Sequence, residues 1–352
     1  MWTLRENDRI VVTGASGFIG AAVVRALTAR GARVTALVEP GADERNLTDV
    51  ERITADIRDP KAVCKAVAGA RFVVHLAAVY RFWARDPNLF YQVNVDGTRN
   101  VIEAVKGAGC ERLVFTSTVG VLSQRGPGPA DETSVARPGD LHGHYKRSKY
   151  AAEHEILRAG AEGLDVTLVL PTFPLGPGDL APTPTGKVIV DYLNGRIPGY
   201  ADISLNVVHV DDLAQGHIAA LERGRPGRSY IIGGENMPMR AILEVLAGFA
   251  GRQAPSLRVP AGLAALTGAV STLIEGRVLR REPRVPFEAA RMAAGTMAFN
   301  DARARTELGY RSRPAREAIL DSARWFKANG YVTSSPARGR RTQSHYTGRS
   351  SS

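Results

Sequence analysis

The sequence predicts an α/β fold, in which a doubly wound parallel sheet is joined to a smaller C-terminal lobe. Three observations support this prediction. Short apolar runs alternate with segments of helical spacing over the first half of the chain, a glycine-rich turn joins the first run to the first helix, and Pro- and Gly-rich loops break the alternation from residue 174. A chain of 352 residues is long enough to bury an ample core in one large domain or two lobes.

The first strand, 10–12, runs into the turn Thr13–Gly20, which reads T-G-A-S-G-F-I-G and opens a helix. Gly14 allows a sharp turn, Gly17 lets a pyrophosphate approach the backbone, and Gly20 lets the helix pack close to the strand. The helix N-terminus offers N–H groups to phosphates. The turn therefore indicates a dinucleotide site, although three glycines near a turn also occur for structural reasons alone. Its candidate residues are Gly14, Ser16, Gly17, Phe18, Ile19 and Gly20.

The second strand, 33–38, ends at Glu39, 19 residues after Gly20. A carboxylate at this position accepts hydrogen bonds from an adenosine ribose and repels a 2′-phosphate, so we expect NAD. Arg45, in the loop that follows, is the candidate partner of a 2′-phosphate and keeps NADP open as the alternative.

The next elements repeat the alternation of strand and helix. We expect strands at 51–54, 71–76, 110–115 and 166–170, and helices at 60–68, 88–108 and 145–158. In a parallel sheet the carboxyl ends of the strands meet at one edge, where ligands bind. Small or polar residues follow three of these ends: Ala77-Ala78, Thr116-Ser117-Thr118 and Pro171-Thr172.

A candidate catalytic set lies near this edge. Tyr145 and Lys149 are four residues apart and share one helix face. An ammonium there favours the phenolate and lowers the tyrosine pKa toward the range of a useful acid or base. Thr118 can orient a substrate oxygen. Two loops, Tyr80–Asp86 with its aromatic and basic residues and 123–143, are expected to face the substrate.

We assign residues 1–173 to the sheet domain, with strands near 205–210 and 229–232 completing the sheet, and 174–330 mainly to an interleaved substrate-binding lobe. Asp211 and Asp212 are expected to cap a helix at 213–221. The segment Val259–Ile274 carries no charge and is too short to span a bilayer. It predicts a buried helix or helical hairpin, with weak membrane-surface contact as the alternative.

Composition narrows the partners. The net charge is +11, of which +4 lies in residues 333–352, a Ser/Thr/Arg-rich tail expected to be disordered. The remaining +7 is spread without an aromatic-interleaved patch, so we expect no nucleic-acid partner. Cys64 and Cys110 show neither disulfide nor metal spacing, and no secretory signal precedes the first strand. We therefore expect a cytoplasmic protein without a bound metal.

Together these motifs resemble the extended short-chain dehydrogenase/reductases of the NAD-dependent epimerase/dehydratase type. The resemblance spans 10 to about 328 and rests on Thr13–Gly20, Asp56-Ile57, His75–Ala78, Asn94–Thr98, Thr116–Thr118 and Tyr145-x-x-x-Lys149. It implies a Rossmann-type domain, bound NAD or NADP, and a catalytic set of Thr118, Tyr145 and Lys149. It also implies where the cofactor would be contacted: by Asp56 and Ile57 at the adenine, by Ala77 along its length, by Lys149 at the nicotinamide ribose, and by Pro171 and Thr172 near the carboxamide. Further implied cofactor-binding residues are Leu76, Ala78, Asn94, Thr116 and Tyr145.

The likeness is narrower to hopanoid-associated sugar epimerases and dihydroflavonol 4-reductases. It rests on Tyr80–Pro87, Gly143–Lys149, Pro182–Gly186 and Gly233–Asn236. Two positions depart from the pattern: Glu39 stands where many relatives carry Arg, and Leu205 stands where nucleotide-sugar epimerases carry an Arg that grips the diphosphate. We therefore expect weak binding of UDP-sugars.

The expected activity is hydride transfer at a carbinol or carbonyl carbon of a small, sugar-like substrate, contacted by Tyr80, Trp83, Thr118 and Tyr145. A dihydroflavonol-reductase-like carbonyl reductase is the alternative, because the same three catalytic residues serve both reactions. A non-catalytic redox sensor is a third reading, which the retained Thr118, Tyr145 and Lys149 disfavour. A homodimer remains open.

Overall fold

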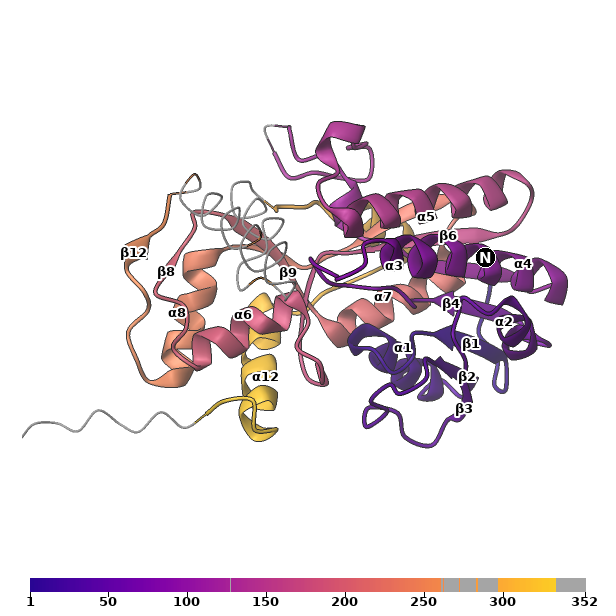
Figure 1. The fold of residues 1–352 in the computed structure, drawn as a ribbon, viewed down its shortest axis with the longest axis horizontal. Coiled ribbons are helices and arrows are strands. Elements are labelled where there is room, and N and C mark those ends of the chain that lie inside the picture. Colours follow the sequence, from indigo (N-terminus) through magenta and orange to yellow (C-terminus); the bar gives the residue numbers. More distant parts are fainter. Residues whose placement is uncertain (127, 261, 263–271, 273–282, 284–296, 334–352) are drawn as a thin grey trace, which may run out of the picture.

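The computed structural model describes residues 1–126, 128–260, 262, 272, 283 and 297–333 (Figure 1). The tail 333–352, apart from Thr333, and most of Val259–Ile274 lie outside these residues. A seven-stranded parallel sheet forms the centre of the N-terminal part, in the order β10-β6-β5-β4-β1-β2-β3. Its strands are β1 (Arg9–Thr13), β2 (Arg33–Val38), β3 (Glu51–Thr54), β4 (Phe72–His75), β5 (Arg112–Thr116), β6 (Val166–Pro171) and β10 (Arg228–Ile232).

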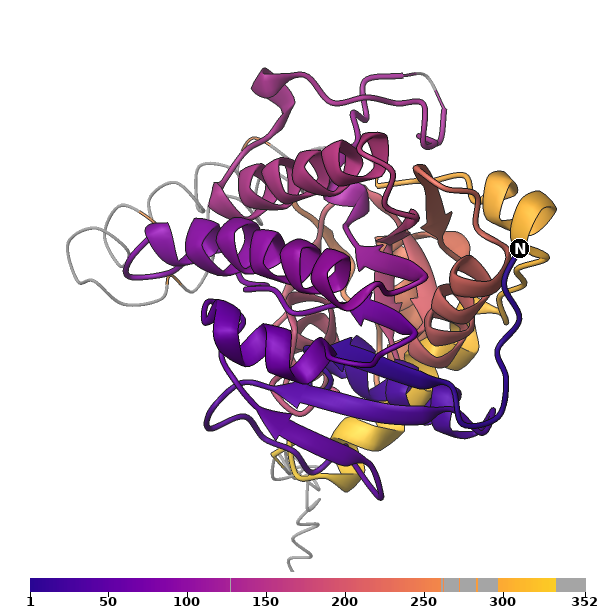
Figure 2. The same cartoon turned by 90° about the vertical axis from the view of Figure 1, so that its right-hand side faces the viewer.

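Helices cover both faces of this sheet, which is why its central strands are continuous apolar runs. One face carries α1 (Phe18–Thr28), α7 (Val210–Arg223) and α11 (Ala302–Leu308); the other carries α2 (Pro60–Val67), α4 (Gly97–Ala108) and α5 (His144–Ala161) (Figure 2). As expected, α2 begins with Pro60 in its first turn, and Asp59 caps it by accepting from the N–H groups of Lys61 and Ala62. The predicted doubly wound α/β fold is confirmed.

The helix expected at 88–108 contains an irregularity that periodicity did not predict. It is built from α3 (Asn88–Tyr91), a π-helical turn η1 (Gln92–Asp96) and α4. A π-turn inserts a residue into the helical repeat and re-aims the side chains within it. This turn contains the buried Asn94.

The smaller part of the molecule contains a second, three-stranded sheet in the order β11-β9-β7. It comprises β7 (Phe173–Leu175), β9 (Ser204–His209) and β11 (Glu235–Pro238), while β8 (Gly199–Tyr200) pairs with β12 (Leu257–Arg258). Helices α6 (Pro184–Leu193), α8 (Met239–Ala250) and α12 (Ala315–Ala328) lie on this side of the molecule (Figure 1).

Two expectations for this region were wrong. The strand near 205–210 does not complete the main sheet: β10 alone extends it beyond β6, because β9 pairs with β7 and β11 instead. Nor do Asp211 and Asp212 cap the following helix. The ring Nδ1 of His209 accepts from the Asp211 N–H and caps α7, which begins at Val210.

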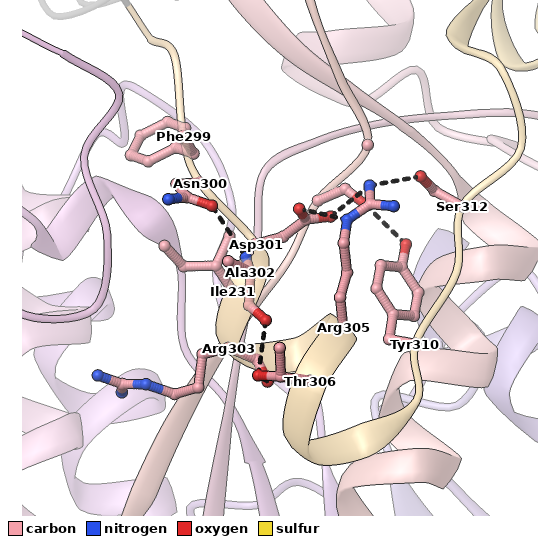
Figure 3. Close-up of polar contacts among 12 residues, drawn as sticks. Ile231, Phe299, Asn300, Asp301, Ala302, Arg303, Arg305, Thr306, Tyr310 and Ser312 are labelled. Atoms are coloured by element: carbon pink, nitrogen blue, oxygen red, sulfur yellow. Dashed lines mark hydrogen bonds and ion pairs between the residues drawn. The ribbon is translucent and has the colours of Figure 1, made fainter.

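The segment 299–312 returns the chain to the main sheet (Figure 3). Arg305 pairs with Asp301 through bonds of 2.7 and 3.0 Å and also donates to Ser312. Tyr310 donates its hydroxyl to the carbonyl of Gly233 just after β10. Arg313 then forks onto Asp212 in α7. These contacts attach the segment leading to α12 to the sheet domain.

Candidate active site

The strand order reverses between β1 and β4, and the glycine turn lies at this switch point. Gly14 has φ +66°, and a Cβ there would stand 2.7 Å from the Ala77 nitrogen. A Cβ on Gly20 would stand 2.1 Å from the Gly14 carbonyl oxygen. Gly17 caps α1 without a side-chain hydrogen bond, and the first turn contains no acidic residue. The turn therefore leaves a cradle of backbone with a positive helix terminus, as an anionic diphosphate requires.

A buried chain of hydrogen bonds fixes this turn to the neighbouring strand and helix. Thr98 donates to the Asn94 carbonyl, so its oxygen accepts from His75 Nε2–H at 3.0 Å. The other ring nitrogen, Nδ1, then accepts from the Thr13 hydroxyl at 2.6 Å, and the Thr13 oxygen accepts from the Ala77 N–H. Burial lowers the pKa of His75 to about 3, with the Lys149 charge acting in the same direction. His75 is therefore neutral and holds one tautomer.

The residues expected at the adenosine end lie beyond β2 and β3. Ile57 is buried, and a Cβ on Gly97 would stand 2.6 Å from its Cδ1, so α4 packs directly onto this residue. Asp56 pairs with Arg58, and this guanidinium holds the pKa of the Asp56 carboxyl below its usual range. The Arg45 side chain pairs with Asp43.

The three hydroxyl residues at the end of β5, Thr116, Ser117 and Thr118, do not all face the ligand edge of the sheet as the sequence had suggested. Successive side chains of an extended chain point to opposite faces. Thr116 Oγ1 bonds to His217 Nε2 of α7 at 3.0 Å, whereas Ser117 donates to the Glu153 carboxylate of α5. Thr118 Oγ1 accepts from the Gly120 N–H and remains as the third hydroxyl of the set. Thr116 reaches the site through its carbonyl oxygen rather than its side chain.

Tyr145 and Lys149 lie on the buried face of α5, with 8% and 3% of their surface exposed. Lys149 Nζ donates to the Thr116 carbonyl at 2.7 Å and lies 4.3 Å from the centre of the Phe115 ring. Burial lowers the pKa of Lys149 to about 7, and the negative charge of Glu153 acts in the opposite direction. The lysine therefore sits where a small electrostatic change alters its protonation at neutral pH.

The aromatic loop after β4 lies over this pair. The Tyr80 ring is 5.1 Å from the Tyr145 ring, centre to centre, with 49° between their planes. Asn94 holds the root of the loop, because its Oδ1 accepts from the Val79 N–H at 2.8 Å and its Nδ2 donates to Ser148 Oγ at 2.9 Å. The side chain of Asn94 thus bonds to the protein itself and joins the loop to α5. Trp83 is partly buried in the same loop.

The end of β6 contributes Pro171, which is in the strand, and Thr172, which lies between β6 and β7. Thr172 Oγ1 is buried and has no hydrogen-bond partner among the described residues. An unsatisfied buried hydroxyl costs free energy unless a ligand supplies the bond. A dinucleotide whose diphosphate lay on the glycine turn could offer this hydroxyl a hydrogen-bond partner through a polar carboxamide at its other end.

Sequence reasoning missed Glu153, His217 and Ser148. All three act on residues that it had identified: Glu153 on Ser117, His217 on Thr116, and Ser148 on Asn94. The signal available for Glu153 was its spacing, since 145, 149 and 153 recur at four-residue intervals on one helix face. Nothing in the sequence indicated His217, which is 101 residues from its partner.

In the part of the chain that the structure describes, no helix is long and apolar enough to cross a membrane. Nor do three or more His, Cys, Asp or Glu side chains gather there in a way that could hold a metal ion.

Comparison with known proteins gives concordant results. Residues 10–233 match the model of the NAD dependent epimerase/dehydratase family. The chain is 37% identical over 335 residues to a putative dihydroflavonol 4-reductase of Synechocystis, covering 92% of this chain and 96% of that one. It is 31% identical to sterol demethylase protein B of Methylococcus capsulatus, covering 92% and 99%.

Solved structures agree. The crystal structure of gox2253 superimposes with a TM-score of 0.83 at 40% identity, covering 93% of this chain and all of that one. A nucleoside-diphosphate-sugar epimerase from Pseudomonas aeruginosa gives 0.76 at 25% identity, covering 92% and 99%. The protein belongs to the NAD-dependent epimerase/dehydratase family of extended short-chain dehydrogenase/reductases.

Proposed function

We propose that this enzyme transfers hydride between NAD and the carbonyl or carbinol carbon of a compound with an apolar or flat body. The residues Gly14–Gly20, Glu39, Ile57, Ala77, Lys149 and Thr172 would hold the cofactor. A bound nicotinamide supplies or accepts the hydride. The protein supplies the matching proton and the geometry.

In the reducing direction Tyr145 donates its hydroxyl proton to the carbonyl oxygen. In the oxidising direction the phenolate of Tyr145 takes the proton from the alcohol. The Lys149 ammonium stabilises that phenolate, since an opposite charge favours the ionised form of an acid. Thr118 orients the substrate oxygen by a hydrogen bond. Burial of Tyr145 and Lys149 strengthens these interactions, because the local dielectric is low.

The observation that carries the substrate class is the packing of Tyr80 on Tyr145. The aromatic loop brings a flat apolar surface to the proton donor itself, which suits the apolar face of a ring or an alkyl chain. Leu205 supports this proposal. It is 3% exposed in β9 and forms a bridge with Met297, where a nucleotide-sugar enzyme would present an arginine. Relatives named putative dihydroflavonol 4-reductase and 2-alkyl-3-oxoalkanoate reductase have carbonyl substrates in their names.

A panel of carbonyl compounds tests the proposal. The protein with NADH or NADPH is given a dihydroflavonol or a 2-alkyl-3-oxoalkanoate, and oxidation of the nicotinamide is followed by its absorbance. We expect NADH oxidation with a carbonyl probe, and loss of the signal in Tyr145→Phe. Conversion of UDP-glucose to UDP-galactose by protein that retains NAD⁺ would identify an epimerase instead. The homodimer and the cytoplasmic location stay predictions.

A further inference from the structure

Glu153 is a carboxylate beside the catalytic set that the proposed mechanism does not use. It lies on α5 one turn beyond Lys149, partly buried, and it accepts a hydrogen bond from Ser117. Burial raises the pKa of its carboxyl, while the Ser117 bond and the Lys149 charge lower it. A buried carboxylate is costly unless it meets a cation or a donor. Glu153 has a donor in Ser117 and lies one helical turn from Lys149, so it places a negative charge beside the lysine.

We propose that Glu153 is a positioning residue of the active site, whose carboxylate keeps Lys149 protonated while Ser117 holds that carboxylate in place. The inference rests on the proposed role of Lys149. The geometric support is a pair of hydrogen bonds made by two consecutive residues at the end of β5. The Thr116 carbonyl accepts from Lys149 Nζ, and the Ser117 hydroxyl donates to Glu153. The strand end therefore holds both the lysine and the carboxylate, one helical turn apart on α5.

The groups around Lys149 leave Glu153 as its counter-charge. The groups that β5 presents to Lys149 are the Thr116 carbonyl and the Phe115 ring, and both are neutral. From β4 it faces His75, whose hydrogen bonds and lowered pKa keep it uncharged. On α5 itself, Glu153 supplies the negative charge that raises the pKa of Lys149 against burial. A further titratable group beside Glu153 is His154, which is exposed at the next position of the helix.

The functional consequence follows from the pKa of about 7 for Lys149. With this pKa, roughly half of the protein molecules carry a charged Lys149 at neutral pH. Each further unit by which the pKa falls lowers that charged fraction by up to about tenfold. Without the carboxylate, burial alone would deprotonate Lys149 and remove the charge that activates Tyr145. Glu153 thereby sets the pH range in which the catalytic pair works.

The test titrates Lys149 directly, without substrate or turnover. The sequence contains seven lysines, so the ε-carbon resonances of protein labelled with ¹³C-lysine are few, and Lys149 is assigned by its loss in Lys149→Met. Glu153→Gln keeps the volume and an acceptor for Ser117 but removes the charge. We expect the Lys149 midpoint to fall by about one pH unit in this variant. The matched control is Glu155→Gln, which removes a carboxylate of the same helix that pairs with Arg99 and Arg158 and should leave the Lys149 midpoint unchanged.

An unchanged midpoint in Glu153→Gln, or an equal shift in Glu155→Gln, would overturn the proposal. If Glu153→Gln does not fold, the reciprocal measurement decides. Removing the cation in Lys149→Met must raise the pKa of Glu153, read from its carboxyl ¹³C resonance and assigned with Glu153→Asp. No rise there would equally refute the pairing. Because both readouts are protonation states, their failure is distinct from failure of the carbonyl panel to reveal a substrate.

Discussion

Asn94 donates its side-chain amide to the hydroxyl of Ser148 at 2.9 Å, and Ser148 in turn donates to the carbonyl of Tyr145. The π-helical turn before α4 is therefore bonded to the first turn of α5, where the proposed proton donor lies. Through its Oδ1, the same Asn94 holds Val79 at the root of the aromatic loop. One buried amide thus sets the position of the loop relative to Tyr145.

Replacing Asn94 should loosen both contacts. Asn94→Ala is expected to cost about 2 kcal/mol of unfolding free energy, because it removes buried hydrogen bonds and leaves their partners unpaired. Urea denaturation measures the loss. The control is Gln92→Ala, an exposed position of the same π-turn that should change stability by about 0.5 kcal/mol or less. Equal effects of the two substitutions would show that the turn, rather than the amide, matters.

Cofactor preference should follow the charge of Glu39. We expect the unmodified protein to bind NAD more tightly than NADP, and Glu39→Gln to narrow the difference by about tenfold because the repulsion of a 2′-phosphate is removed. Calorimetric titration of both cofactors checks this, with Glu44→Gln as a control, since Glu44 pairs with Arg52. Tighter NADP binding by the unmodified protein would instead point to Arg45, released from Asp43.

Tyr145→Phe should separate chemistry from binding. The substitution removes the titrating hydroxyl and little volume, so turnover should fall by about 10²-fold or more while NAD binding stays near normal. Tyr150→Phe is the matched control, because Tyr150 lies on the same helix and packs against His154. Normal turnover by Tyr145→Phe would make Tyr145 a structural residue.

Stability should fall as the solution is acidified below pH 6.5. His75 and His217 are buried and neutral, and burial lowers their pKa values to about 3 and about 4. The folded state therefore does not bind the protons that the unfolded chain binds below its pKa near 6.5. The stabilisation is complete above that pH and is lost as the pH falls toward the folded pKa values, about 4 for His217 and about 3 for His75. For the two groups the loss at pH 5 is about 4 kcal/mol.

Urea melts at several pH values measure this slope. His217→Gln should reduce the slope of the unfolding free energy against pH by about half, because the unfolded chain then takes up one of the two protons instead of both. The exposed His154 provides the control, and His154→Gln should leave the slope intact. A slope that His217→Gln does not change would assign the acid sensitivity to other groups.

UDP-sugars should bind weakly. Leu205 replaces one charge-assisted diphosphate contact, which is worth on the order of 1.5–3 kcal/mol. Calorimetry of the NAD-loaded protein with UDP, UDP-glucose and UDP-galactose tests this. Micromolar binding of any of the three would restore the nucleotide-sugar reading.

The sequence by itself determined the main sheet and the identity of its ligand edge. Apolar runs such as 33–38 and 166–170 can be buried only as central strands. Gly14 and Gly20 are needed because a Cβ at either position would collide with neighbouring backbone atoms. Tyr145 and Lys149 were readable because helical spacing is local, and the structure places both on the buried face of α5. Each of these signals lies within about 20 residues.

Only the tertiary structure decided which hydroxyls reach the crevice and which strands share a sheet. Thr116, Ser117 and Thr118 look alike in the sequence, yet the partners that take the first two, His217 and Glu153, come from opposite faces of the sheet. β9 is as buried as a strand of the main sheet, but it pairs with β7 and β11 and is not part of that sheet. Hydrogen-bond partners and strand neighbours depend on packing between segments distant in sequence, which a local pattern does not contain.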